Sequence, residues 1–125
     1  MFKSVLGGAI LFATSLPLLA AEPGKTMDTS AGKAYVDEKG MTLYTFDKDK
    51  PNESNCYDQC AVKWPPYMAD ANAKSEGEWM VVERKDGSKM WAHENQPLYT
   101  YIEDKKPGDV TGDGVGGVWH IAKPD

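Results

Sequence analysis

The two cysteines, Cys56 and Cys60, have the most versatile chemistry of any residues in this chain. As thiolates they would be soft sulfur ligands suited to copper, with His93, His120 and one methionine completing such a site. The candidate methionines are Met68, Met80 and Met90. In an oxidising compartment an even cysteine count instead favours a disulfide. The C-x-x-x-C spacing places both sulfurs on one helical turn, near enough to be bridged. We expect the disulfide, with a periplasmic copper or redox site as the alternative.

A Y-x-[FY]-x-x-D pattern occurs twice, with an offset of 55 residues, and the same offset relates two downstream tryptophans. Segments matched at a fixed offset indicate an internal duplication. Two copies are too few for a solenoid, so we expect them to pack together as pseudo-symmetric halves of one domain. The matched residues are Tyr44, Phe46, Asp49 and Trp64 in the first copy and Tyr99, Tyr101, Asp104 and Trp119 in the second.

The matched aromatic residues admit two roles. On a strand, residues i and i+2 share one face, which places Tyr44 with Phe46 and Tyr99 with Tyr101. Such pairs could form a platform on which a flat ligand stacks. Aromatic residues with this spacing more often form the buried face of a sheet. We therefore expect these rings, with the two matched tryptophans, to be buried between the halves.

The two matched acids, Asp49 and Asp104, stand where a predicted strand gives way to a turn. An Asp at such a place commonly accepts backbone N–H groups and stabilises the turn. Acids related by pseudo-symmetry could also form a catalytic dyad or ligate a metal. No G-x-S-x-G motif accompanies them, and the two histidines belong to no triad pattern. We expect a turn-stabilising role and no enzymatic activity.

The segment from Asp109 to Gly114 resembles the start of a calcium-binding loop. Oxygen-bearing side chains stand at positions one, three and five (Asp109, Thr111 and Asp113), and glycine stands at position six. Position twelve is His120, where such a loop has a bidentate Glu. The other interpretation is a glycine-rich turn held by its own acids. We expect the turn and no cofactor, with a calcium-stabilised extracellular interaction domain as an alternative.

Short alternating segments between turn residues predict a mainly β fold. We expect a small antiparallel sheet domain of two pseudo-symmetric repeats with one short helix. Residues 22–33 are predicted to be a flexible leader, followed by a single domain over residues 34–125. Within it, repeat one covers residues 34–68 and repeat two covers residues 79–124. The expected strands are 34–36, 41–46, 79–84, 89–93, 98–102 and 118–122, and the expected helix is 56–62.

Residues 1–21 have the character of a secretory signal peptide. Lys3 gives a positive start, an apolar stretch follows, and small residues precede Glu22. The apolar stretch is too short for a comfortable membrane span, and no cysteine near the cleavage site could carry a lipid anchor. Loss of Lys3 would change the net charge from −5 to −6. An acidic domain repels phosphate backbones, so we expect no nucleic-acid partner and a periplasmic or secreted location.

The duplicated motif, the run from Cys56 to Pro66 and the Pro107-Gly108-Asp109 turn together resemble one family over about residues 34–124. It is the family of secreted repeats of unknown function, described as predicted lipoproteins with a Y-x-[FWY]-x-x-D motif. The chain departs from the lipoprotein description because it lacks the anchoring cysteine. The resemblance implies export and supplies no reaction. We expect a non-enzymatic binding module of the periplasm or envelope, whose partner is a small ligand or an envelope component. The matching residues of the run are Cys56, Cys60, Ala61, Trp64, Pro65 and Pro66.

Overall fold

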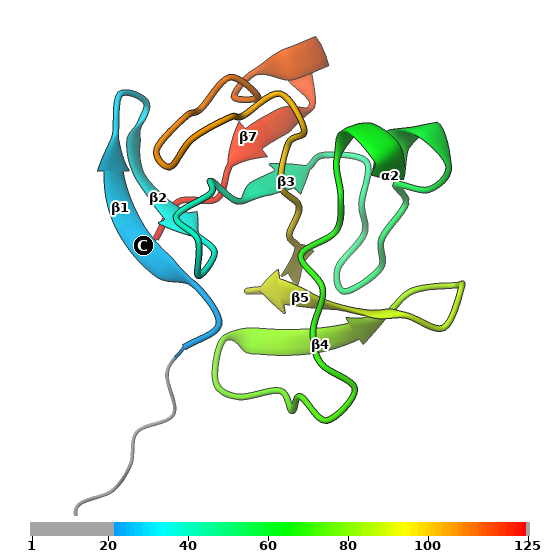
Figure 1. Ribbon diagram of the computed structural model, residues 1–125. Coiled ribbons are helices and arrows are strands. Elements are labelled where there is room, and N and C mark those ends of the chain that lie inside the picture. The colour runs from blue at the N-terminus through cyan, green and yellow to red at the C-terminus, as the bar shows by residue number, and fades with distance from the viewer. Residues whose placement is uncertain (1–21, 125) are drawn as a thin grey trace, which may run out of the picture.

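The computed structural model describes residues 22–124 of the chain, so the expected signal peptide lies outside the described residues. Within this range, short strands form three small antiparallel sheets, and one α-helix of five residues covers one end (Figure 1). The mainly β fold predicted from the sequence is confirmed. None of the helices in residues 22–124 has both the length and the apolar character needed to cross a membrane.

Each repeat begins with a hairpin. In repeat one, β1 (Lys25–Thr29) pairs with β2 (Gly32–Val36). In repeat two, β4 (Trp79–Glu83) pairs with β5 (Lys89–His93), and the other edge of β5 carries β6 (Gln96–Pro97). The turn between β4 and β5 is the Asp-Gly turn, where Gly87 has a φ of 89° that glycine adopts without strain.

The predicted flexible leader, residues 22–33, is wrong from residue 25 onward. Residues 25–29 form β1, and residues 32 and 33 begin β2. Apart from Met27, the side chains of β1 are polar, and all five are half-buried or exposed, so no hydrophobic alternation marks this strand. It forms because its backbone pairs with β2 along all five residues, and that pairing is invisible in the local hydropathy pattern.

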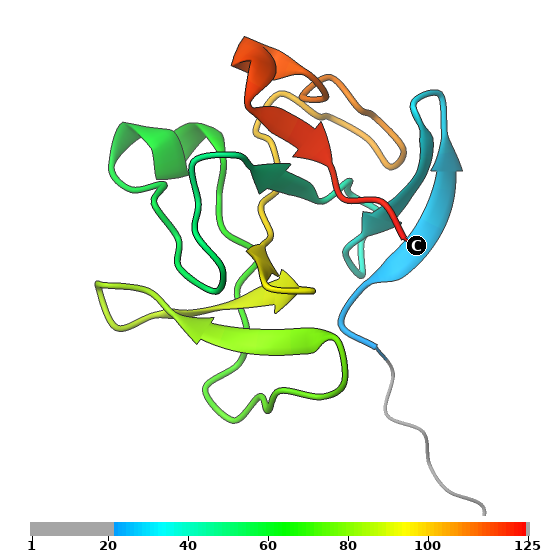
Figure 2. The same cartoon turned by 180° about the vertical axis from the view of Figure 1, so that it is seen from behind.

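Strands from the two repeats pair with each other at the centre of the molecule. β3 (Tyr44–Phe46) of repeat one pairs with β7 (Trp119–Ile121) of repeat two, and Figures 1 and 2 show the two side by side. Residues 63–66 lie along residues 99–102 in the corresponding way, with the N–H of Thr100 donating to the carbonyl oxygen of Pro65 at 2.9 Å. Pro65 and Pro66 have no N–H to donate, so this ladder is one-sided. The strand predicted for residues 98–102 is therefore wrong, and only isolated bridges occur there.

Hydrogen bonds that recur in both halves establish a pseudo-twofold relation. At its axis the N–H of Tyr44 donates to the carbonyl oxygen of Tyr99 at 2.7 Å, and the N–H of Tyr99 donates to that of Tyr44 at 3.0 Å. The duplication predicted from the 55-residue offset is thereby confirmed. Two further pairs of backbone hydrogen bonds match. The N–H of Tyr35 donates to the carbonyl oxygen of Ala122 as that of Trp91 donates to Tyr67, and the N–H of Leu43 donates to Tyr35 as that of Leu98 donates to Trp91.

The α-helix α2 (Gln59–Lys63) begins later than the sequence predicts. Asp58 has a φ of 56° and a ψ of −125°, a positive-φ conformation that a right-handed α-helix cannot contain. The residue before the helix is Asp58, and no side chain caps the helix.

Buried side chains form two clusters. The larger surrounds the pseudo-twofold axis and contains the matched tyrosines and tryptophans. The smaller lies beside the two hairpins, where the C-terminal end of the chain meets β2 (Figure 2). Its buried members are Tyr35, Leu43, Trp79, Leu98 and Ala122.

Candidate functional site

The matched tyrosines and acids bond to each other across the two repeats. The hydroxyl of Tyr44 donates to Oδ2 of Asp104, and the hydroxyl of Tyr99 donates to Oδ2 of Asp49, both at 2.7 Å. Each tyrosine thus uses the acid of the other repeat. Both tyrosine side chains are fully buried. We name these four residues the clasp.

The second carboxylate oxygen of each acid stabilises the loop that follows it. Oδ1 of Asp49 accepts the backbone N–H of Asn55 at 2.7 Å. Oδ1 of Asp104 accepts the backbone N–H of Thr111 at 2.9 Å and its hydroxyl at 2.5 Å. The predicted turn-stabilising role of both acids is confirmed. Because each acid is bonded to a different tyrosine and a different loop, the structure does not join them into a dyad.

Burial also determines the protonation of the clasp. It raises the pKa of Tyr44 and of Tyr99 far above the ordinary value, and the carboxylate that each hydroxyl bonds adds to the effect. Burial likewise raises the pKa of Asp49, against the opposing effect of its hydrogen bonds from Tyr99 and Asn55. A tyrosine whose proton is held this firmly is poorly suited to acid–base catalysis near neutral pH.

The other matched rings form a continuous stack. Phe46 stacks on Trp119 with ring centroids 4.2 Å apart, Trp119 stacks on Trp64 at 3.8 Å, and Trp64 stacks on Tyr101 at 3.9 Å. Here too the aromatic residue of each motif packs on the tryptophan of the other repeat. Both tryptophans are only 4% exposed. The predicted burial is confirmed for the matched tyrosines and tryptophans, whereas Phe46 and Tyr101 at the ends of the stack are only partly buried. The indole faces that a flat ligand would need are covered by neighbouring rings.

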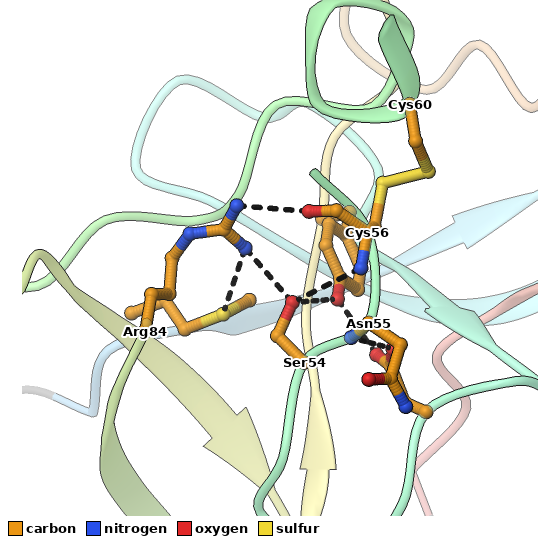
Figure 3. The surroundings of a disulfide bond; sticks show 8 residues. Ser54, Asn55, Cys56, Cys60 and Arg84 are labelled. Carbon is orange, nitrogen blue, oxygen red and sulfur yellow. Dashed lines mark hydrogen bonds between the residues drawn. A yellow bond between two sulfur atoms is a disulfide. The ribbon is translucent and has the colours of Figure 1, made fainter. Parts of the chain in front are cut away.

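The predicted disulfide between Cys56 and Cys60 is confirmed (Figure 3). Cys60 lies in α2, but Cys56 precedes the helix, so the prediction that both stand on one helical turn is wrong. The bridge instead ties the first turn of the helix to the loop that carries Asn55. Because the two sulfurs are bonded to each other, they are not the free thiolates that the alternative copper site would need.

Arg84 is a buried residue that sequence reasoning missed. Its Nη1 donates to the hydroxyl of Ser54 and its Nη2 donates to the carbonyl oxygen of Cys56, both at 2.8 Å (Figure 3). The guanidinium also lies over the ring of Tyr57, 4.2 Å from its centroid. Strand alternation puts Arg84 on the same face as Val82, which is buried, and this pattern could have revealed it. The side chain connects the second hairpin to the disulfide segment.

The other predicted metal ligands have backbone or side-chain partners of their own. Oδ2 of Asp109 accepts the N–H groups of residues 105 and 106, and Oδ1 of Asp113 accepts the N–H of Ile121. Nε2 of His120 lies 2.9 Å from Oδ2 of Asp47. In the part of the chain that the structure describes, no three His, Cys, Asp or Glu side chains converge to hold a metal ion. The structure therefore does not bring the copper or the calcium ligands together.

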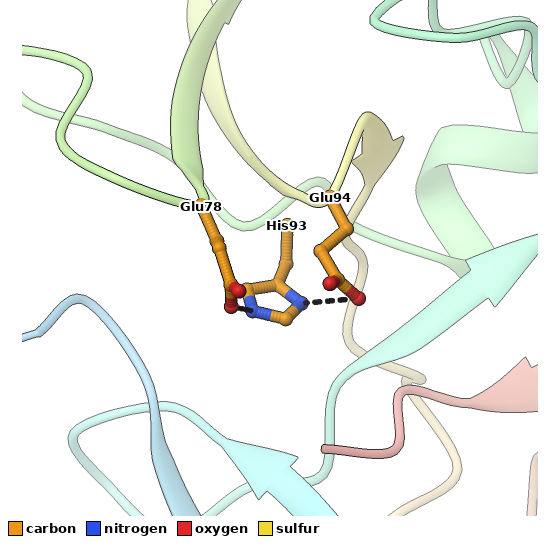
Figure 4. A network of polar contacts seen from close by, with 3 residues as sticks. All are labelled: Glu78, His93 and Glu94. Atoms are coloured by element: carbon orange, nitrogen blue, oxygen red, sulfur yellow. Dashed lines mark hydrogen bonds and ion pairs between the residues drawn. The ribbon is translucent and has the colours of Figure 1, made fainter. Parts of the chain in front are cut away.

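His93 is the last residue of β5, as the prediction of a strand residue requires. Its Nε2 lies 3.1 Å from Oε1 of Glu78 and its Nδ1 lies 3.9 Å from Oε1 of Glu94 (Figure 4). The ring also packs against Tyr35 and Trp79, with centroids 4.6 Å apart in each case. The imidazole thus fills the edge of the smaller core and positions two carboxylates at the surface.

Outside the clasp, a surface hollow of about 450 Å³ lies beside Trp91. Its apolar lining comes mainly from Trp91 and Tyr67, both partly buried, and from Met68, which is 50% exposed. We name it the Trp91 hollow. It has no counterpart of the same composition in the other half, because the 55-residue offset puts Ala122 and Lys123 where Tyr67 and Met68 stand. The acids that line it are Glu22, Glu38 and Asp70.

Comparison with known families agrees with this architecture. The family model described as "Secreted repeat of unknown function" matches the chain twice, over residues 25–68 and residues 80–123. The first match includes β1, in agreement with the strand that the structure adds to repeat one. No curated protein and no solved structure matches the chain. The two matches cover most of the chain, which therefore belongs to the family of secreted repeats of unknown function.

Proposed function

We propose that this protein is an exported, non-enzymatic binding module of the periplasm or cell envelope. The observation that carries the proposal is the clasp. Of the residues that both repeats share and that could otherwise perform chemistry, Tyr44, Tyr99 and Asp104 are buried and Asp49 is partly buried, and each acid is bonded to a tyrosine. We assign ligand contact to surface residues outside the clasp.

The Trp91 hollow supports this division of roles. Its two rings and the thioether of Met68 offer apolar surface at the edge of the smaller core. Binding sites commonly combine such apolar lining with a few polar groups. The ring of Tyr67 and the thioether of Met68 break the pseudo-twofold relation, because Ala122 and Lys123 stand at the matching positions of the other half. The packing of the two repeats therefore does not require these two side chains.

Two observations support an exported location. The family is described as secreted. The Cys56–Cys60 bridge is the form that a cysteine pair takes in an oxidising compartment such as the periplasm.

A thermal-shift screen tests the proposal. Residues 22–125 would be screened against amines, sugars, nucleotides and peptides, and assayed in parallel for turnover of chromogenic esters, phosphates and glycosides. We expect saturable stabilisation by one ligand class, since a ligand at a hundred times its Kd adds about 2.7 kcal/mol to the free energy of unfolding. We expect no turnover. Turnover that the folded variants Asp49→Asn or Asp104→Asn abolish would refute the proposal.

A further inference from the structure

The Trp91 hollow presents aromatic surface and negative charge to the same volume. Three carboxylates, those of Glu22, Glu38 and Asp70, line it against one ammonium group, that of Lys25. All four of these residues are exposed. The faces of indole and phenol rings attract cations, and carboxylates at the rim add a longer-ranged attraction. This combination matches a positively charged group that also has apolar surface.

Tyr67 also lies close to acidic side chains. Its hydroxyl donates to the carbonyl oxygen of Pro23, which holds the N-terminal end of the described chain across the rim of the hollow. Burial raises the pKa of Tyr67 to about 12, and the charges of Asp37 and Glu38 contribute to the rise. A site that disfavours a phenolate through nearby carboxylates favours a cation by the same Coulomb interaction.

The chemistry of the lining also excludes other ligand classes. Anionic ligands would be repelled by the three carboxylates. A strongly hydrated metal ion needs several oxygen ligands at short range, and no group of three such residues converges in residues 22–124. An alkylammonium head group is attracted by the carboxylates and needs no set of converging oxygen ligands. Its methyl or methylene groups pack on rings and on a thioether such as that of Met68.

We propose that the Trp91 hollow binds a small organic cation, a quaternary or protonated alkylamine, seated on the rings of Trp91 and Tyr67 and faced by Glu38 and Asp70. The inference rests on the proposed binding function and names its ligand class. The volume of about 450 Å³ accommodates a head group together with a short chain.

Choline chloride is the probe, titrated into residues 22–125 at constant ionic strength. The readout is the indole N–H resonance of Trp91 in a ¹H–¹⁵N spectrum, with the other three tryptophans as internal references. We expect saturable shifts at Trp91 and little change at Trp64 and Trp119, which are buried. The uncharged isostere 3,3-dimethylbutan-1-ol should bind at least about tenfold more weakly, because it lacks the cation–π and carboxylate attraction.

Two variants test the assignment of residues. The double variant Glu38→Gln/Asp70→Asn should weaken choline binding about five- to tenfold. Its control, Glu103→Gln/Asp58→Asn, changes the net charge by the same amount at exposed positions outside the hollow and should leave choline binding unchanged. Trp91→Leu should weaken binding about fivefold, and the acid variant keeps the test decisive if Trp91→Leu does not fold.

The outcomes separate this inference from the proposed function. Equal binding of choline and its isostere, or equal loss in the acid variant and its control, would overturn the cation assignment. If choline causes no shift while another ligand class binds saturably elsewhere, the inference falls and the binding function stands. Turnover that depends on the clasp acids would instead overturn the function itself.

Discussion

The clasp makes a quantitative prediction for the Tyr99→Phe variant. The substitution removes one hydroxyl and keeps the ring, including its edge-to-face packing against Trp119 at 5.3 Å. The lost hydroxyl donates to Asp49 at 2.7 Å and lies 2.6 Å from the hydroxyl of Ser54, which keeps its bond from Arg84. A hydrogen bond to a charged group contributes about 1.5–3 kcal/mol. We therefore expect the free energy of unfolding to fall by about 2–3 kcal/mol and the melting temperature by about 10 °C.

The partner substitution Asp49→Asn should cost less. An amide oxygen can still accept the N–H of Asn55, and the variant no longer holds a carboxylate whose ionised form burial disfavours. We expect a loss of about 1 kcal/mol. In the double variant the losses should not add, and the coupling energy between Tyr99 and Asp49 should be about 1–2 kcal/mol, as for residues in direct contact.

Urea unfolding followed by tryptophan fluorescence measures all four states of this cycle. Tyr101→Phe is the matched control, because no hydrogen bond of its hydroxyl occurs in residues 22–124 and its ring stacks on Trp64; it should change stability by less than about 0.5 kcal/mol. The pseudo-twofold relation also requires Tyr44→Phe to cost a similar amount to Tyr99→Phe. A loss below about 0.5 kcal/mol for Tyr99→Phe, or zero coupling to Asp49, would refute the reasoning.

Other consequences can be checked on the same protein. Trp119→Ala should cost about 3–5 kcal/mol because it opens the ring stack, and an unchanged melting temperature would contradict the buried stack. Tyr44 and Tyr99, whose pKa values are raised, contribute stability that is present up to the ordinary tyrosine pKa of 10.0 and is lost as pH rises above it; absorbance at 295 nm should show both protonated in the folded protein at about pH 11. Because the pKa of Asp49 is raised in the folded protein, its stabilising contribution is complete below its ordinary pKa of 3.8 and is lost as pH rises through its pKa in the folded protein. The free-energy cost of Asp49→Asn should therefore be larger at acid pH than at neutral pH. Reducing the disulfide should increase hydrogen exchange in residues 52–66 and leave the sheets protected, because the closed loop is short; loss of protection throughout the sheets would contradict a local role.

Several elements could be predicted because their signals are local. Residues 89–93 form β5 with the bounds that the sequence indicates, since the Asp-Gly turn before them fixes the hairpin. The burial of the matched tyrosines and tryptophans also followed from the sequence alone. A large ring gains by leaving water whatever its partner is, so this prediction needed no knowledge of the packing.

Other elements could not be predicted because a distant partner or a single backbone conformation decides them. β1 has no apolar face and exists through its pairing with β2. Residues 98–102 have the pattern of a strand, but the prolines opposite them cannot complete the ladder. The start of α2 depends on the positive φ of Asp58, which no periodicity in the sequence indicates.

The sequence by itself determined that the chain is built from two like halves and which residues they share. It did not determine whether each tyrosine bonds the acid of its own repeat or that of the other, because the two copies of the motif are chemically alike. Only the tertiary structure decided this, by pairing Tyr44 with Tyr99 at the axis so that each hydroxyl reaches the acid of the other repeat. The Trp91 hollow has the same origin: Tyr67 and Trp91 are distant in the chain, and the fold places them side by side through the backbone bond from Trp91 to Tyr67 at 2.8 Å.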